Sequence, residues 1–127
     1  MYTYDYDTSY SPSMPVVEAE VSPFGGGDIT VVVSAMLDSG SDGSMLPLEV
    51  LHQIGARRSG KVAMRTITGV RNFVDIYEIS LRIGPHTFPK VRVAADRYNP
   101  IMIVGRDVLN HMVVVLNGLA SSTEIHD

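Results

Sequence analysis

Apolar and polar residues alternate in short runs along most of the chain, a pattern typical of β-strands rather than of long helices. The runs VVEAEVS and ITVVVSAML are rich in β-branched residues, and the turn PFGGGD between them favours a hairpin. Further strands are predicted from KVAMRTI, FVDIYEISLRI, HTFPKVRVAA and IMIVG. A last hairpin is predicted from VVVLNGLASSTEI, with a two-residue turn at Asn117-Gly118.

Two short segments carry helical signals instead. Pro47 suits the first position of a helix, LEVLHQI has apolar residues at helical spacing, and Gly55 follows as a C-cap. The segment RDVLNHM is long enough for at most two helical turns. The pattern therefore predicts an all-β barrel or sandwich with one or two short helices.

The first 14 residues differ from the rest, because they hold four of the six tyrosines among Thr, Asp and Ser. We predict a flexible tyrosine-rich tail over residues 1–14 and one folded domain over residues 15–127. Tyr2, Tyr4 and Tyr6 alternate at strand spacing, so a strand added to a sheet edge is the alternative.

Composition narrows the classes of function. The formal charge is -4 and the pI is about 5.4, which argues against a binder of nucleic acid or of an anionic membrane. Without cysteine the chain has no thiolate nucleophile and no Cys-ligated zinc, and its four histidines are not at metal-ligand spacing. No cofactor is expected. No signal peptide or membrane-spanning run is recognisable, so we expect a cytoplasmic protein.

The stretch SAMLDSGSDGSML, residues 34–46, carries the candidate chemistry. As a calcium loop it would place Asp38 at position 1, Asp42 at 5, Gly43 at 6, the Ser44 carbonyl at 7 and Glu49 at 12. Position 3 would then be Gly40, which has no ligand oxygen, and a strand precedes the loop where an EF-hand needs a helix. The pattern therefore argues against a calcium-binding loop.

The other interpretation is a carboxylate that activates water. Such a group has to be held rigidly, and a tight turn at the end of a buried strand does this. Gly40 allows the backbone to approach the Asp38 carboxylate, and Ser39 supplies a hydroxyl that can brace the turn. Asp-Ser-Gly is also ordinary turn chemistry. A second element, the apolar strand IMIVG running into Arg106 and Asp107, favours the catalytic interpretation.

Together the segments MLDSGSD and IVGRDVL resemble the aspartic proteases of the retropepsin type, most closely the small bacterial members, over residues 16–125. The segment MRTITGVRNFVDIY lies between them, where that family has its flap hairpin. The resemblance implies a retropepsin-like acid-protease barrel in which Asp38 is the catalytic carboxylate and Ser39 and Gly40 complete its triplet. It further implies support of the catalytic loop by Ser41, Asp42, Gly105, Arg106 and Asp107, with Asp42 paired to Arg106, and a flap that binds substrate through Ile67, Thr68, Gly69 and Val70.

The resemblance implies an aspartic endopeptidase that hydrolyses peptide bonds of a peptide or protein substrate. This chemistry needs two carboxylates around one water, and the chain has a single Asp-Ser-Gly. We therefore expect a C2 homodimer in which each subunit contributes one Asp38. Two close carboxylates do not both ionise easily, so activity is expected at acidic to mildly acidic pH. The alternative is a catalytically weak retropepsin-like module for dimerisation or peptide binding.

Overall fold

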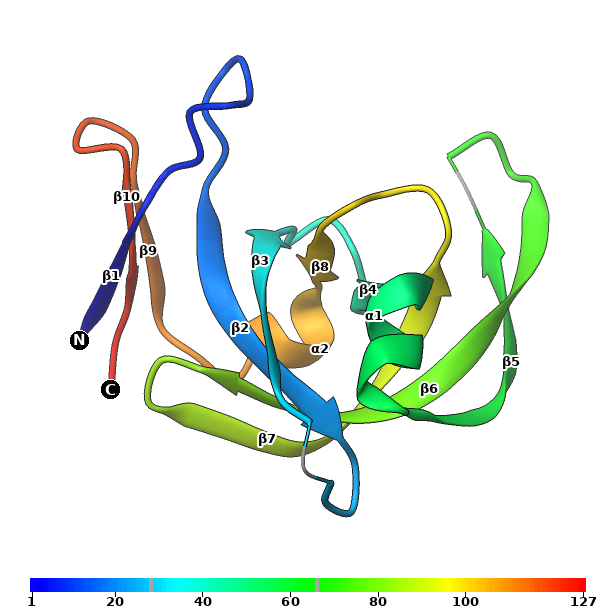
Figure 1. Ribbon diagram of the computed structural model, residues 1–127. Coiled ribbons are helices and arrows are strands. Elements are labelled where there is room, and N and C mark those ends of the chain that lie inside the picture. The colour runs from blue at the N-terminus through cyan, green and yellow to red at the C-terminus, as the bar shows by residue number, and fades with distance from the viewer. Residues whose placement is uncertain (28, 66) are drawn as a thin grey trace.

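A closed barrel of six strands forms the centre of the molecule. The computed structural model describes residues 1–27, 29–65 and 67–127. Around the barrel the strands are β2 (Val16–Pro23), β3 (Val31–Leu37), β8 (Met102–Val104), β4 (Met45–Pro47), β7 (His86–Asp96) and β6 (Arg71–Ile83). Because β6 also pairs with β2, the circle closes, while β5 (Arg57–Arg65) extends beyond β6 (Figure 1). The fold is mostly β with two short helices, as predicted.

Most neighbouring strands are antiparallel, but two pairs are parallel. β3 runs parallel to β8, and β4 runs parallel to β7. Strand β4 was not predicted from the sequence because it has only three residues and directly precedes a helix. The β3–β8 pair brings the end of β3 beside the end of β8, although Leu37 and its partner Val104 lie 67 positions apart in the sequence. The ends of these strands carry the candidate site.

The barrel interior follows the alternation of side chains along each strand. In β2, Val17, Ala19 and Val21 are buried while Glu18 is exposed. The same alternation buries Ile79, Leu81 and Ile83 of β6 and Val91 and Val93 of β7. Burying a side chain of this kind contributes about 1.5–3 kcal/mol. The core formed in this way is the rigid support of the strand ends.

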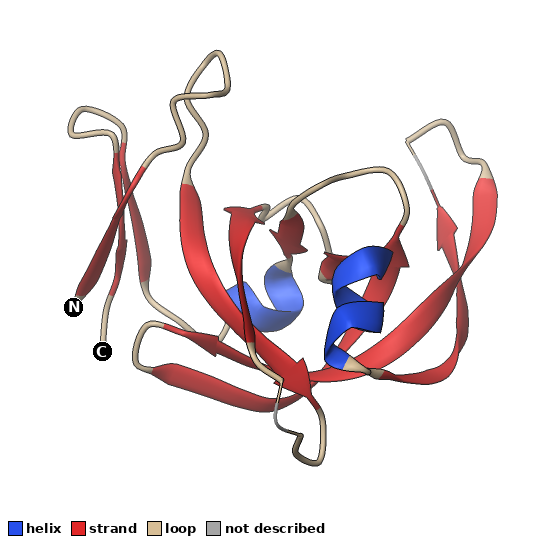
Figure 2. Cartoon of the chain, viewed as in Figure 1, coloured by secondary structure: helices blue, strands red, loops and turns tan. Residues whose placement is uncertain are grey.

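The two helices pack against the barrel (Figure 2). Helix α1 (Leu48–Ile54) follows Pro47 and places Leu51 and Ile54 in the core. It ends at Gly55, which has a φ of 68°, a left-handed conformation that favours glycine. Helix α2 (Arg106–Leu109) is a single turn that buries Val108. Both helices lie where the sequence predicts them.

The N-terminal residues differ from the prediction of a flexible tail. Residues Tyr2–Asp5 form β1, which pairs antiparallel with β10 (Ser122–Ile125), and β10 pairs with β9 (Val114–Asn117). The physical reason is that strand spacing places Tyr4 on the inner side, where it packs against the hydrophobic core and where burial raises the pKa of its hydroxyl. The alternative of an added edge strand describes residues 2–5 correctly.

The turn between β9 and β10 also differs from the prediction. Asn117 pairs directly with Ser122, so the loop has the four residues 118–121 rather than two. Ser121 takes a positive φ of 52° and the Asn117 side chain accepts a hydrogen bond from the Ala120 N–H at 3.1 Å. Asn117 therefore braces a longer loop from the last position of its strand.

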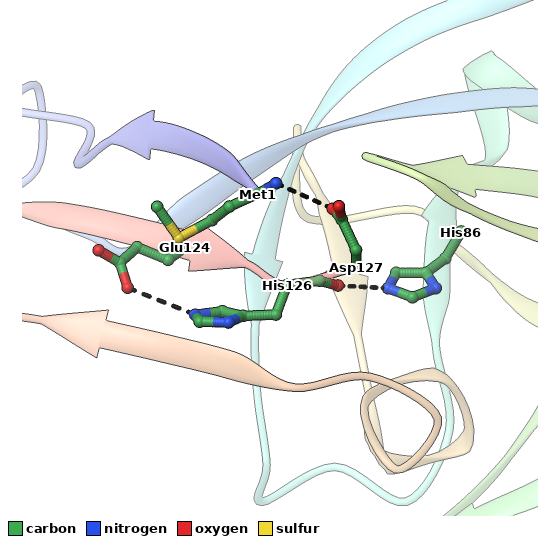
Figure 3. A network of polar contacts seen from close by, with 5 residues as sticks. All are labelled: Met1, His86, Glu124, His126 and Asp127. Atoms are coloured by element: carbon green, nitrogen blue, oxygen red, sulfur yellow. Dashed lines mark hydrogen bonds and ion pairs between the residues drawn. The ribbon is translucent and has the colours of Figure 1, made fainter.

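The two chain ends lie side by side and are joined by polar contacts (Figure 3). The Met1 ammonium lies 2.9 Å from the Asp127 carboxylate and holds the pKa of that carboxyl below its ordinary value. The His86 ring donates through Nε2 to the His126 carbonyl at 2.7 Å, which ties the start of β7 to the residue after β10. Within the described ranges, neither helix is long and apolar enough to cross a membrane.

Candidate active site

Asp38 lies immediately after β3, at the point where this strand leaves its parallel partner β8. Its N–H donates to the Val104 carbonyl at 2.9 Å, which continues the β3–β8 pairing by one residue. Its own carbonyl accepts from the Ser41 N–H at 3.1 Å and closes a tight turn. The backbone of Asp38 is therefore fixed on both sides, while its side chain is only half-buried.

The Asp38 carboxylate is oriented by the turn that follows it. Its Oδ1 atom accepts a hydrogen bond from the Gly40 N–H at 2.9 Å. A Cβ atom at residue 40 would lie 3.1 Å from this same oxygen, so glycine gives the carboxylate the room for that bond. Among the contacts of the described residues, Oδ2 accepts no hydrogen bond, and this oxygen remains for solvent or a reacting group. Charge-assisted bonds of this kind hold a carboxylate in one orientation.

The Ser41 hydroxyl braces the loop itself. It donates to the Gly43 carbonyl at 2.7 Å, while the Ser41 carbonyl accepts from the Arg106 N–H at 2.8 Å. The segment after β8 thus contacts the loop directly through the backbone. Ser39, between Asp38 and Gly40, is exposed.

The predicted ion pair between Asp42 and Arg106 is wrong. The Arg106 guanidinium instead donates through Nη1 to the Ser39 carbonyl at 2.7 Å, and within the described part of the chain Asp42 forms no ion pair. The reason lies in the turn: Asp42 is exposed, whereas the Ser39 carbonyl faces the start of α2. Arg106 therefore holds the loop through a backbone oxygen.

Ser44 joins the loop after Asp38 to the segment after β8. This role was not predicted from the sequence. Ser44 is only 2% exposed, and its hydroxyl donates to Asp107 Oδ1 at 2.7 Å while accepting from the Gly105 N–H at 3.0 Å. The Ser44 N–H donates to the other oxygen of Asp107 at 3.2 Å. Its position directly before the apolar β4 is the one signal in the sequence that could have suggested a buried hydroxyl.

Gly105 fits between the two segments because it has no side chain. A Cβ atom at this position would lie 2.5 Å from the Gly43 carbonyl oxygen and 2.9 Å from that of Ser41. Such distances would push the loop away from the segment after β8. Gly105 and Asp107 therefore lie in contact with the loop that follows Asp38.

The hairpin of β5 and β6 rises beside this loop (Figure 1). Its predicted tip, Ile67 to Val70, is exposed and forms the turn, and Gly69 takes a φ of 81°. Thr66, which belongs to the same predicted segment, lies outside the described residues. Phe73, further along β6, is 76% exposed and was not predicted as part of the site. The hairpin thus exposes the apolar side chains of Ile67, Val70 and Phe73 beside the charged residues Arg65 and Arg71.

A cavity of about 380 Å³ separates the Asp38 loop from this hairpin. Residues 41–45 form one wall and residues 62–65 of β5 the other, and Ile76, Arg92 and Ala94 complete the lining. A second cavity of about 430 Å³ continues along the hairpin to Phe73, Arg97 and Tyr98. The carboxyl groups nearby do not gather as a metal site: within the described ranges, no three His, Asp or Glu side chains are placed to hold an ion.

A comparison with protein family models shows to which family the chain belongs. A family model described as aspartyl protease matches residues 17–108, a range that contains both the Asp38 loop and the segment from Gly105 to Asp107. The chain belongs to the aspartyl protease family. No curated protein has a significantly similar sequence.

Solved structures show that this member of the aspartyl protease family has a retropepsin-like fold. The protease of simian foamy virus (mac) is 20% identical with a TM-score of 0.54, and the match covers 75% of this chain and 91% of that one. EIAV protease, solved with the inhibitor HBY-793, is 18% identical with a TM-score of 0.58, over 77% and 86% of the two chains. The retroviral protease-like domain of Ddi1 from Leishmania major is 16% identical with a TM-score of 0.53, over 89% and 90%. The predicted family and barrel are confirmed.

Proposed function

We propose that the chain is an aspartic endopeptidase that works as a C2 homodimer, with one Asp38 from each subunit at the twofold axis. The observation that carries the proposal is the placement of Asp38: its backbone is fixed by Val104 and Ser41, and its carboxylate is oriented by the Gly40 N–H. A carboxylate on such a rigid turn, half-exposed at the end of a barrel strand, is suited to activating a water molecule.

The single carboxylate explains the need for a second subunit. Hydrolysis by this chemistry uses one ionised carboxylate to take a proton from water and one protonated carboxylate to polarise the scissile carbonyl. The chain contains one Asp-Ser-Gly, so the second carboxylate comes from an identical subunit. Because two close carboxylates share a proton, activity is expected at acidic to mildly acidic pH.

The other residues of the site have supporting roles in this proposal. Ser39 and Gly40 complete the turn of Asp38, and Ser41 braces it through the Gly43 carbonyl. Gly105, Arg106 and Asp107 hold the loop from beneath. The hairpin tip, Ile67 to Val70, closes over the bound peptide as a flap, which excludes water and orients the substrate. A catalytically weak peptide-binding or dimerisation module is the alternative function.

Replacement of Asp38 by Asn tests the proposal. Asn has nearly the same size and can still accept the Gly40 hydrogen bond, but it cannot take a proton from water. The expected result is a loss of acid proteolysis by orders of magnitude, measured on a peptide library between about pH 3 and 7, with the dimer retained in sedimentation. A purified Asp38→Asn protein that cleaves at the parental rate would overturn the assignment. A parent protein that binds peptides without cleaving any would favour the binding module.

A further inference from the structure

The cavity beside the Asp38 loop is lined by more positive than negative side chains. Its lining contains Arg65 at the end of β5, Arg92 on β7 and one carboxylate, Asp42. All three residues are exposed. The remaining lining residues are neutral, so the cavity carries a net positive charge in a chain whose overall charge is -4.

Neither arginine is neutralised by an ion pair among the described residues. Arg92 lies opposite Glu78 in the β6–β7 ladder, but Glu78 Oε2 pairs with Lys90 at 2.9 Å. The other carboxylate on this part of β6, Asp75, pairs with Arg58 at 2.9 Å and lies 4.0 Å from Arg97. Glu78 and Asp75 are therefore already paired with other cations, and Asp42 is the one carboxylate among the described lining residues that faces the two arginines.

The hairpin adds a second, independent observation. Arg65 and Arg71 are direct partners in the β5–β6 ladder, at the last pair before the tip. Like charges placed directly opposite each other destabilise an antiparallel pair. An anion bound next to Arg65 would offset this repulsion and so stabilise the hairpin at the same time as it fills the cavity.

We infer that this cavity accepts a glutamate or aspartate side chain of the substrate, so that the enzyme prefers peptides with an acidic residue close to the scissile bond. The inference rests on the proposed function and names its substrate class. The cavity begins at Ser41, three residues after Asp38, so the acidic residue lies within a few positions of the cleaved bond rather than at it. In a C2 dimer the cavity occurs twice, once on each side of the axis, and acidic residues on either side are accepted.

The first experiment compares pairs of peptides that differ by Glu or Gln at one position. A sequence cleaved by the parent protein is varied position by position, and kcat/KM is measured for each pair at about pH 5.5, where a peptide Glu is ionised. We expect a preference for Glu of about three- to tenfold at positions near the scissile bond, the range that one or two solvent-accessible charge pairs supply. The same change several residues further away should have no effect. As pH falls below about 4, the preference should fade because the peptide carboxylate becomes protonated.

Matched variants connect this preference to the cavity. Arg65→Gln and Arg92→Gln each remove one charge from the lining, and each should reduce the ratio of Glu to Gln cleavage towards one. Arg57→Gln is the control, because Arg57 is an exposed residue of the same strand that lies outside this cavity and at the other end of β5. Arg65→Glu should shift the preference towards Lys at the same peptide position.

Peptide binding to the Asp38→Asn protein tests the preference for acidic residues independently of the proposed catalytic function. Fluorescence anisotropy with the labelled Glu and Gln peptides measures affinity without cleavage. Tighter binding of the Glu peptide that is lost in the Arg65→Gln background supports the inference, even if the parent proved not to cleave peptides. Equal affinities for the Glu and Gln peptides, or the same loss in the Arg57→Gln control, would overturn it.

Discussion

At the scale of single residues, the buried Ser44 joins the Asp38 loop to the segment after β8. Its hydroxyl has two partners, Asp107 Oδ1 as acceptor and the Gly105 N–H as donor. Both partners belong to the segment after β8, whereas Ser44 belongs to the Asp38 loop. This buried hydroxyl thus helps to fix the distance between the two segments, together with the bonds from Arg106 to the Ser41 and Ser39 carbonyls.

Replacing Ser44 by Ala should therefore destabilise the protein. The change leaves the buried Gly105 N–H without its acceptor, and a group of this kind left unpaired costs about 1–3 kcal/mol. The free energy of unfolding, measured by urea titration, should fall by that amount. If the proposed function holds, kcat should fall with it because Asp38 is held by the same loop.

Ser34→Ala is the matched control for this prediction. Ser34 lies on β3 but is exposed, and within the described part of the chain its side chain makes no hydrogen bond. Its replacement should change stability by less than about 0.5 kcal/mol. Equal effects of Ser44→Ala and Ser34→Ala would show that the buried hydrogen bonds do not support the loop.

At the scale of elements, β1 is the strand whose presence departs most from expectation. Among the described strands it pairs with β10 alone, and its inner residue Tyr4 packs against the core. Ile125 of β10, the partner strand, is completely buried in the same core. The N-terminal strand therefore helps to cover the C-terminal end of the chain.

We expect Tyr4→Ala to lower the free energy of unfolding by about 1–3 kcal/mol, less than the 3–5 kcal/mol of a fully buried aromatic residue, because Tyr4 is only partly buried. Thr3→Ala, on the exposed side of the same strand, should have little effect. Chemical denaturation of both variants checks the difference. A Tyr4→Ala protein as stable as Thr3→Ala would mean that residues 1–14 behave as the flexible tail that the composition suggests.

At the scale of the whole molecule, the proposal is that one subunit holds half of an active site. Mixing subunits tests this directly. Parent protein and Asp38→Asn protein are mixed in equal amounts and allowed to exchange, and activity is measured against total parent subunits. If a dimer needs two Asp38 carboxylates, about one quarter of the dimers are active after random exchange, so activity per parent subunit falls to about one half.

Activity per parent subunit that stays constant in this mixture would argue for a site complete within one chain. Dilution of the parent alone gives an independent check, because a dimeric site loses specific activity below its dissociation constant. Sedimentation at the same concentrations and pH relates the loss to dissociation. A monomer that is fully active at every concentration would remove the proposed mechanism.

The sequence by itself determined the local features of this protein. Strand alternation predicted the β elements, Pro47 and Gly55 marked the ends of α1, and the Asp38 and Gly105 segments pointed to the aspartyl protease family. These signals are readable because each depends on the conformational preferences of a few consecutive residues.

Only the tertiary structure decided which distant residues meet. It replaced the expected Asp42–Arg106 pair with a bond from Arg106 to the Ser39 carbonyl, and it showed Ser44 beneath the loop. It also paired β1 with β10 and placed Arg65 and Arg92 around one cavity. The physical reason is that hydrogen bonds over more than 60 residues are set by the closure of the barrel, and a side chain's partner depends on the direction in which a turn presents it.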